Sequence, residues 1–442
     1  MESLILSKAV MLGVQVGWID FSPEERSRTL TVLRALSAPG SVDELGIGIV
    51  RDAVADALFP GTSTLLTKAR YFFLVPYLSR LLEEGHDAIP RDARDLKHEF
   101  DDLERRCAVG LCKRAADLGI TDEGVIGRVA LTRGPGQWVT RGPGEVYWAS
   151  IRTLGFMKDD APDSYLGHFA YLANRRTVTY GGQFDGSDTV GLSDDKHASR
   201  SMWNLPRTLF ESWREDWDDW GSRASIELTT EEAALLGGRI KTQRPGSLYA
   251  LIVGDDRLRG LALGSWRAEG GGYADSAFHS FLEQERGRIE ELSPEAARLC
   301  ALADDFSELV YGCRIAYNMQ LPGLEEEAAD EWEAFAESEE IERAVAVDLD
   351  ALSWELGLSD HSGYSMLAAF LRRSMACMAT GDLEGLKHEV RQREAEIKGT
   401  RKKIGCGSEV EYAWRGGRRL PYRFGYAMSI VDEIVRAGGC DA

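Results

Sequence analysis

The sequence predicts a mostly α-helical, multi-helical protein of two or three domains. Its 442 residues exceed the usual length of a single domain, and 44% hydrophobic residues are typical of a globular chain with a sizeable core. Apolar residues recur at helical spacing in several long segments, and residues that start or end helices flank these segments. A Gly-rich middle segment with a few short strands is the expected exception.

Changes in composition divide the chain into three regions. Residues 1–120 predict an N-terminal helical domain, and residues 121–225 form a Gly/Pro-rich middle segment. Residues 226–442 predict a C-terminal helical domain that contains an acidic segment at 325–342 and a basic tail at 387–424.

Three helices are expected in the first region. The first, over residues 22–37, begins with Ser22 as the N-cap and Pro23 at the first helical position. Residues 62–85 predict a long helix that is kinked near Pro76, because proline removes one backbone hydrogen bond. Residues 93–119 predict another helix that ends at its glycine.

The middle segment carries the tetrapeptide Arg-Gly-Pro-Gly twice, at 133–136 and 141–144, which indicates two similar turns. Residues 144–156 predict a short amphipathic helix. Together with residues 122–131 it forms either a helix-turn-helix-like unit or two packed core helices. Residues 180–206 are rich in Gly, Asp and Ser and predict a long loop.

The third region begins with a helix that is capped at Thr229 or Thr230, where the Thr-Thr-Glu-Glu order is typical of a capping box. Farther on, Glu325 to Glu342 hold ten carboxylates and no Lys or Arg. Such a block is typical of a solvated helix face or a flexible linker. It is also the segment that would bind a basic partner if the protein were purely a scaffold.

Net charge and cysteine pattern limit the possible functions. The formal charge of −20 repels nucleic acid at long range, yet it leaves room for a local basic groove. We expect no membrane span, because no run of about 18 apolar residues occurs. Seven cysteines without a Cys-x-x-Cys pair predict reduced thiols in the cytoplasm rather than a zinc site, and no cofactor is expected.

No strong catalytic motif is present. The sequence lacks a GxxxxGK[ST] phosphate loop, an HExxH zinc motif and a G-x-S-x-G nucleophile elbow, and its seven histidines are not spaced as metal ligands. The question of an enzyme therefore stays open at this point, with a non-enzymatic protein favoured.

The stretch from Asp43 to Phe72 holds the first candidate site. Asp52 and Asp56 lie one helical turn apart and repel each other unless a cation bridges them, for which Arg51, Lys68 or Arg70 are available. Hydroxyls and free N–H groups at a helix N-terminus attract phosphate. The candidate contacts are Thr62, Ser63, Thr64, Lys68 and Arg70. In the structural alternative, Ser63 or Thr64 caps the helix, and Arg51 and the aspartates form an ion-pair network.

The basic tail holds the second candidate. Between Lys387 and Arg423, eleven Lys or Arg oppose five Glu. Basic residues interleaved with aromatic ones suit contact with a nucleic-acid backbone and stacking on bases. The candidate contacts are Arg415, Arg418, Arg419 and Arg423. The two Arg-Gly-Pro-Gly copies, with Arg128 and Arg152 nearby, are a weaker candidate surface.

Several blocks of the sequence resemble one bacterial family of unknown function. They are GWIDFSPEER, DELGIGIVRDAVADALFPGTSTLLTKARYFFLVPY, GVIGR, EVYWASIRTLGF, LTTEEAALLGGRIKTQRPGSLYALIV, DDFSELVYGCRIAYNMQL and LPYRFGYAMSIVDEIV. The first blocks are the most specific. The resemblance implies a gene neighbourhood of helicases, phospholipase-D-type nucleases and methyltransferases in antiphage defence islands. It carries over no catalytic residue.

We therefore expect a non-enzymatic component of a bacterial antiphage defence system. It would contact DNA or a helicase, nuclease or methyltransferase partner through local basic surfaces. One alternative is a metal-dependent hydrolase or nuclease, for which the candidate residues are Asp43, Glu44, Asp52 and Asp56; carboxylates of this kind hold Mg²⁺ largely through water and phosphate oxygens. The other alternative is the pure protein scaffold.

Overall fold

The computed structural model is helical throughout its described part. It describes residues 43–84, 92–134, 136–181, 201–215, 220–271, 276–406, 412, 414–416 and 419–438. Within these ranges the secondary structure is α-helix, apart from a short 3-10 helix at Gly399–Arg401 and an isolated bridge between Met157 and Trp203. The predicted mostly α-helical class is confirmed. The short strands expected in the middle segment do not occur among the described residues.

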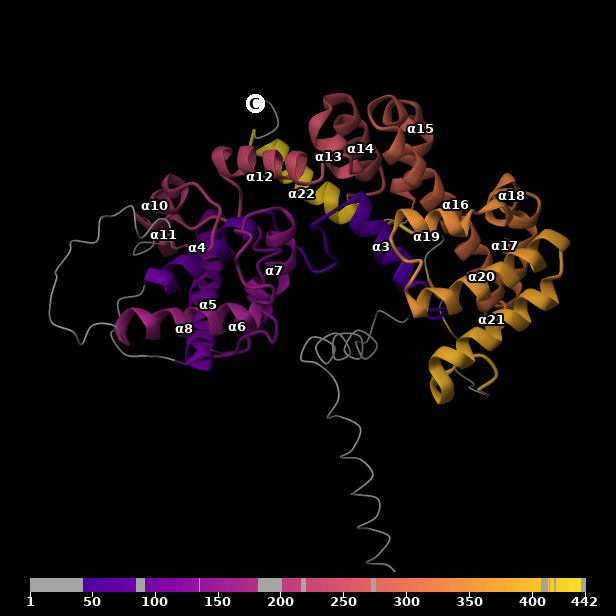
Figure 1. Cartoon of the computed structure of the whole chain (residues 1–442), viewed down its shortest axis with the longest axis horizontal. Helices are drawn as coiled ribbons and strands as arrows, with labels where there is room; N and C mark the ends of the chain where they lie inside the picture. The colour runs from indigo at the N-terminus through magenta and orange to yellow at the C-terminus, as the bar shows by residue number, and fades with distance from the viewer. Residues whose placement is uncertain are drawn as a thin grey trace, which may run out of the picture.

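The helices form two lobes that are joined by a central group (Figure 1). The N-terminal lobe holds α4 (Tyr71–Glu84), α5 (Ala93–Leu118), α6 (Arg128–Leu131), α7 (Pro143–Thr153), α8 (Tyr165–Gly181), α10 (Arg207–Glu215) and α11 (Trp220–Arg223). The C-terminal lobe holds α15 (Ala277–Leu292), α16 (Pro294–Asn318), α17 (Glu325–Ala336), α18 (Glu339–Ala346), α19 (Leu349–Glu355), α20 (Ser362–Thr380) and α21 (Leu383–Lys398). The joining group holds α3 (Gly48–Leu58), α12 (Thr230–Gln243), α13 (Leu248–Gly254), α14 (Asp256–Ala268) and α22 (Phe424–Arg436). The predicted division of the chain into residues 1–120, 121–225 and 226–442 stays a prediction.

Helices from opposite ends of the chain meet between the lobes. The last helix, α22, packs against α12, α14 and α15, while α3 packs against α16 and α20. Phe59 follows α3 and makes an edge contact with Phe424, whose ring also stacks on Phe281 of α15. These rings are 1% exposed or less. Burying one such ring contributes about 1.5–3 kcal/mol, so this aromatic cluster fixes the end of α3 to α22 and α15.

Two sequence signals for helix ends are confirmed, and the proline expected within a long helix lies there. Thr229 and Glu232 form a complete capping box at the start of α12. Helix α5 ends at Gly119 in the left-handed conformation that glycine favours. Pro76 lies inside α4, as expected. The helix predicted for residues 22–37 and most of the 180–206 loop lie outside the described residues.

The helix expected from Thr62 was placed too early, because α4 begins only at Tyr71. Side chains from distant helices bind the intervening backbone instead. The Tyr147 hydroxyl accepts hydrogen bonds from the N–H groups of Thr67 and Lys68, and a carboxylate oxygen of Glu433 accepts one from Ala69. These contacts, made across 79 residues or more, outweigh the local preference for a helix.

The middle segment does not form the helix-turn-helix-like unit. Its first helix, α6, has four residues, and α7 packs between α4 and α8 as a core helix. The two Arg-Gly-Pro-Gly copies also differ. Gly134 and Gly136 of the first copy have positive φ angles, whereas the second copy opens α7 with Pro143 at its first turn.

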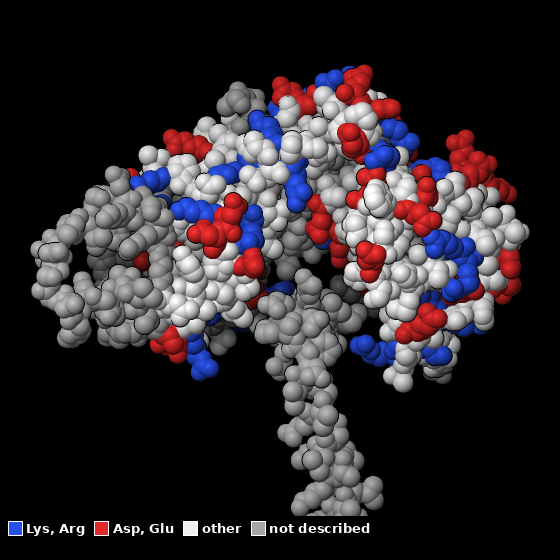
Figure 2. Space-filling view, viewed as in Figure 1, with Lys and Arg blue, Asp and Glu red and all other residues white. Residues whose placement is uncertain are grey.

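The acidic segment is helical and solvated on one face. Helix α17 buries Ala328, Trp332 and Phe335, and Glu325, Glu326 and Glu327 of its first turn are exposed. In the view of Figure 2, basic and acidic side chains are interspersed over both lobes. Among the described helices, none is long and apolar enough to cross a membrane.

Candidate functional site

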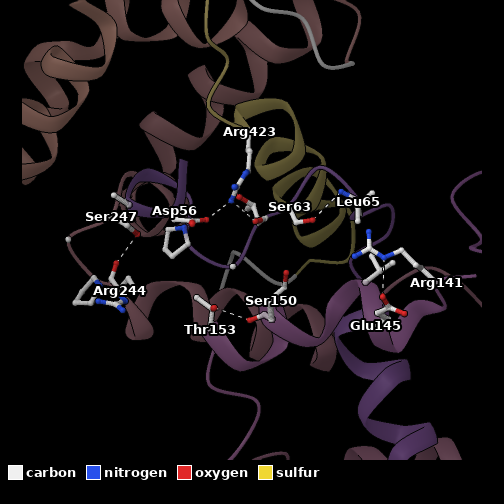
Figure 3. Close-up of a pocket in the computed structure, with 18 residues that line it drawn as sticks. Asp56, Ser63, Leu65, Arg141, Glu145, Ser150, Thr153, Arg244, Ser247 and Arg423 are labelled. Atoms are coloured by element: carbon white, nitrogen blue, oxygen red, sulfur yellow. Dashed lines mark hydrogen bonds and ion pairs between the residues drawn. The ribbon is translucent and has the colours of Figure 1, made fainter. Parts of the chain in front are cut away.

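A cavity of about 900 Å³ lies between the N-terminal lobe and the joining group. Four segments that are far apart in the sequence form it: the end of α3 with the following loop, helix α7 with Arg141 just before it, the link from α12 to α13, and the residue before α22 (Figure 3). We call this the arginine cavity. Its lining residues with polar side chains are Asp56, Thr62, Ser63, Arg141, Glu145, Ser150, Thr153, Arg244, Ser247 and Arg423.

Two of the predicted contacts, Thr62 and Ser63, line the cavity, and Thr64 lies exposed on the same loop. The Thr62 hydroxyl donates to the Phe59 carbonyl at 2.6 Å, and the Ser63 hydroxyl accepts from the Leu65 N–H at 3.1 Å. Neither Ser63 nor Thr64 caps α4, because the helix starts several residues later. The expected N-terminal helix site for phosphate is therefore wrong, and what this loop contributes is hydroxyl groups.

Arg423 brings the basic tail into the same cavity. Its guanidinium group pairs with Asp56 and donates to the Thr62 carbonyl at 3.0 Å, and Asp52 lies 3.6 Å away. Figure 3 shows it reaching from the start of α22 toward Asp56. Arg423 is thus the cation that lies near both aspartates, while Arg51 pairs with Asp52 at 3.0 Å. Lys68 and Arg70 pair with other carboxylates. One candidate from each predicted site meets here.

The backbone at Arg423 is strained. Tyr422 and Arg423 have φ angles of 44° and 65°, and among the described residues they are the non-glycine residues with positive φ. This conformation costs roughly 1–2 kcal/mol per residue, and such strain clusters at functional sites. Contacts on both sides of this pair must therefore hold Arg423 in position.

Two further arginines complete the cavity. Arg141, from the second Arg-Gly-Pro-Gly copy, pairs with Glu145 at 3.1 Å. Arg244 is exposed, and its guanidinium group has no ion-pair partner among the described residues. Its carbonyl accepts a hydrogen bond from the Ser247 hydroxyl at 2.8 Å. Arg244 was not among the residues predicted from the sequence. A shared signal was available, because three of the lining segments contain a Pro-Gly dipeptide, at 60–61, 143–144 and 245–246.

Charge and hydroxyl groups make the cavity suitable for an anion. Three arginines and two carboxylates line it, in a chain whose formal charge is −20. Ser150 is 3% exposed, and its hydroxyl has no hydrogen-bond partner within the described part of the chain. Guanidinium groups bind phosphate and carboxylate through two parallel hydrogen bonds, and hydroxyls supply further directional contacts.

A buried carboxyl group binds the backbone of the turn that follows Arg141. Glu104 of α5 accepts a hydrogen bond from the Gly144 N–H, and burial raises the pKa of this carboxyl to about 8. The group is therefore largely neutral at pH 7. A Cβ atom at Gly142 would lie 2.1 Å from a Glu104 carboxylate oxygen, so the turn needs glycine there. This contact fixes the start of α7.

Lys68 and Arg70 do not line the cavity. Arg70 is buried, pairs with Glu232 at 3.0 Å and donates to the Ser225 carbonyl at 2.7 Å. Lys68 pairs with Glu433 of α22 at 3.5 Å. Both side chains join distant parts of the fold. The ion-pair network that the structural alternative expected occurs at Arg51 and Asp52, and Arg423 joins it.

The four carboxylates of the hydrolase alternative are not gathered into one cluster. Asp43 accepts hydrogen bonds from the first N–H groups at the start of α3, and Glu44 pairs with two lysines near the end of α21. Asp52 and Asp56 pair with arginines. Each carboxylate therefore already has a structural partner.

The other tail arginines lie elsewhere. The backbone of Arg415 exchanges two hydrogen bonds with Asn318, and its guanidinium carbon lies 5.4 Å from the centre of the Tyr412 ring. Arg419 pairs with Glu308 at 3.0 Å and with Glu340 at 3.3 Å. Arg418 lies outside the described residues. The four tail arginines are thus not gathered at the cavity.

A second charged cluster is buried in the C-terminal lobe, and we call it the α16 network. His279, Asp304 and Glu308 bring ligand atoms within 4.8 Å of one another, which is a spacing that a metal ion could use. Arginines already occupy this cluster: Arg343 pairs with Asp304, and Arg419 pairs with Glu308. Burial raises the pKa of Glu308 to about 7. These cations compete directly with a metal ion for the carboxylates.

Comparisons with known proteins add one similarity. A model described as a family of unknown function, DUF6361, matches residues 14–174. This stretch includes the end of α3, the Thr62 loop and all of α7, but not Arg244 or Arg423. The comparison with curated proteins and the comparison with solved structures each give no match. The expected similarity to a family of unknown function is thus supported for the N-terminal part of the chain.

Proposed function

We propose that the protein is a non-enzymatic nucleic-acid-binding component that holds a backbone phosphate in the arginine cavity. The observation that carries this proposal is the convergence of Arg141, Arg244 and Arg423 on one cavity, with Arg244 lacking a carboxylate partner among the described residues. The chain is acidic overall, and these three arginines come from segments about 100 residues or more apart, so it is the fold that brings them together. The Ser150 hydroxyl is a further available donor.

The size of the cavity favours a flexible strand over a duplex. A volume of about 900 Å³ admits one or two nucleotides, whereas rigid B-form DNA presents its phosphates on a convex surface. Single strands and strand ends can bend into a concave site that offers guanidinium groups. We therefore expect single-stranded oligonucleotides to bind more tightly than duplexes of the same sequence.

The test is a binding titration with a fluorescent single-stranded oligonucleotide across a salt series. The variant Arg141→Ala, Arg244→Ala, Arg423→Ala should lose at least tenfold in affinity. Its slope of log affinity against log salt should become shallower by about 0.7, because that is the contribution of one phosphate contact on a single strand.

The matched control removes the same charge elsewhere. Arg257, Arg298 and Arg372 are exposed and lie outside the cavity. Replacing these three by alanine should leave affinity within about twofold, because scattered charges act only through the screened long-range field. Equal losses in the two triple variants would mean that net charge, and not the cavity, governs binding, and would reject the proposal.

For the cellular role we propose a component of a bacterial antiphage defence system that contacts DNA or a DNA-processing partner. The support for this setting is the sequence resemblance alone. Plaque counts in cells that carry the whole defence locus should rise when the wild-type gene is replaced by the cavity triple variant, and should stay low with the control triple variant. The scaffold alternative predicts protection by both variants and loss of protection when residues 325–342 are replaced.

A further inference from the structure

A short segment connects the α16 network to the arginine cavity. Residues 419–423, which we call the strap, run along α16 and end where α22 begins. The Leu420 N–H donates to the Ser307 hydroxyl at 2.8 Å, and the Tyr422 hydroxyl donates to the Ala303 carbonyl at 2.7 Å. Leu420 and Tyr422 are both 1% exposed. The middle of the strap is therefore fixed to α16.

Each end of the strap carries an arginine with a different role. At one end Arg419 pairs with Glu308 and Glu340 of the network. At the other end Arg423 stands in the cavity against Asp56 and the Thr62 carbonyl. The two positive φ angles lie at the Arg423 end of the strap, at Tyr422 and Arg423. This strained backbone is the part of the strap that can relax when the contacts of the strap with α16 weaken.

Glu308 is the weak point of the first anchor. Its side chain is 1% exposed, and neither of its oxygens has a well-formed hydrogen bond within the described part of the chain. The network holds four carboxylates, Asp304, Asp305, Glu308 and Glu340, against the three arginines Arg286, Arg343 and Arg419. Burial raises the pKa of Glu308 to about 7.

Titratable groups from four helices and from the strap lie near Glu308. The groups that face it are His279 of α15, Asp304 and Tyr311 of α16, Glu331 of α17, Glu340 and Arg343 of α18, and Arg419 of the strap. His279 already binds Asp304. Adding one proton to Glu308 removes the charged partner that Arg419 holds most closely.

We propose that Glu308 is a positioning residue for the arginine cavity, and that its ionisation, passed along the strap through Arg419, sets the position of Arg423 and so the affinity for a phosphodiester. This inference rests on the proposed function for its ligand. Ionised Glu308 holds Arg419 and keeps the strap in its strained form, with Arg423 in the cavity. Neutral Glu308 releases Arg419 to Glu340 alone, and the cavity loses part of its charge.

The first measurement is the affinity for a single-stranded oligonucleotide without terminal phosphates at pH 6 and pH 8, since phosphodiesters do not titrate in that interval. We expect wild-type affinity to be about threefold weaker at pH 6. Glu308→Gln should bind at the weaker level at both pH values. Glu355→Gln, which removes a carboxylate from an ion pair on α19, should keep the wild-type profile. A wild-type profile in Glu308→Gln would overturn the proposal.

The second measurement needs no ligand, so it separates the strap from the cavity function. Urea midpoints are measured for Glu308→Gln, Asp56→Asn and the double variant. These residues lie in different clusters, so unlinked effects would add. We expect the double variant to be shifted less than the sum of the single shifts, because releasing either anchor already relaxes the strap. Additive shifts would overturn the coupling even if the cavity binds nucleic acid. Non-additive shifts without any oligonucleotide binding would reject only the proposed function.

Discussion

The arginine cavity and the α16 network use the same residue types in opposite ways. Both gather three arginines and several carboxylates from distant helices. In the network the carboxylates outnumber the arginines, and Asp304 and Glu308 are almost fully buried. In the cavity the arginines outnumber the lining carboxylates, Asp56 is exposed, and Arg244 lacks a carboxylate partner among the described residues.

The difference shows what turns a charged cluster into a binding site. A buried network must pair its charges internally, since a desolvated charge without a partner costs several kcal/mol. A solvated cavity can keep an excess of positive charge, because water stabilises it until a ligand arrives. Excess charge together with access to solvent, rather than the number of arginines, therefore marks the cavity as the candidate site.

The largest expected effect is a loss of stability when an arginine of the buried α16 network is removed. Arg343→Ala removes a partner of Asp304, whose side chain is 5% exposed, and should lower the free energy of unfolding by about 3 kcal/mol. Urea denaturation measures the change. Arg372→Ala, which breaks an exposed pair with Asp350, is the control and should cost less than about 0.5 kcal/mol. Equal costs would contradict the distinction between the two regions.

A second prediction concerns Glu104, the buried carboxyl group that binds the start of α7. Burial raises the pKa of Glu104 to about 8 in the folded protein, so the folded state binds the proton more tightly than the unfolded state does. Its contribution to stability is therefore present at low pH and is lost as pH rises. Between pH 6 and pH 8 the wild type should lose about 2 kcal/mol through this group.

Glu104→Gln should flatten that part of the stability curve. The amide keeps an acceptor for the Gly144 N–H but has no proton to lose. Stability measured by urea denaturation at pH 6, 7 and 8 checks this expectation. Asp102→Asn on the same helix is the control, because Asp102 forms an exposed pair with Arg105 and should leave the pH dependence unchanged. An unchanged slope in Glu104→Gln would contradict the raised pKa.

The smallest expected effect separates binding from folding within the cavity. Arg244→Ala should weaken oligonucleotide binding about tenfold, equivalent to about 1.4 kcal/mol, and leave the free energy of unfolding unchanged, because Arg244 is exposed and has no ion pair in the described part of the chain. Arg419→Ala, in contrast, should lower the free energy of unfolding, because it removes the closest cation from the buried Glu308 carboxylate. If Arg244→Ala destabilised the fold without affecting binding, the cavity would be structural.

Much of the local structure could be predicted from the sequence. The capping box at Thr229, the glycine that ends α5 and the solvated face of the acidic helix all depend on residues within a few positions of one another. The candidate residues Thr62, Ser63 and Arg423 were also found from composition and spacing, and all three line the cavity.

The sequence by itself determined the helical class and many of the helix ends, because backbone hydrogen bonds, capping and apolar periodicity act within one or two turns. Only the tertiary structure decided that Arg423 faces Asp56, that α4 starts at Tyr71, and that Arg244 joins the same cavity. These outcomes depend on contacts between segments up to 367 residues apart. Such contacts form only when the apolar faces of α3, α12 and α22 are buried together, and no local pattern in the chain encodes that packing.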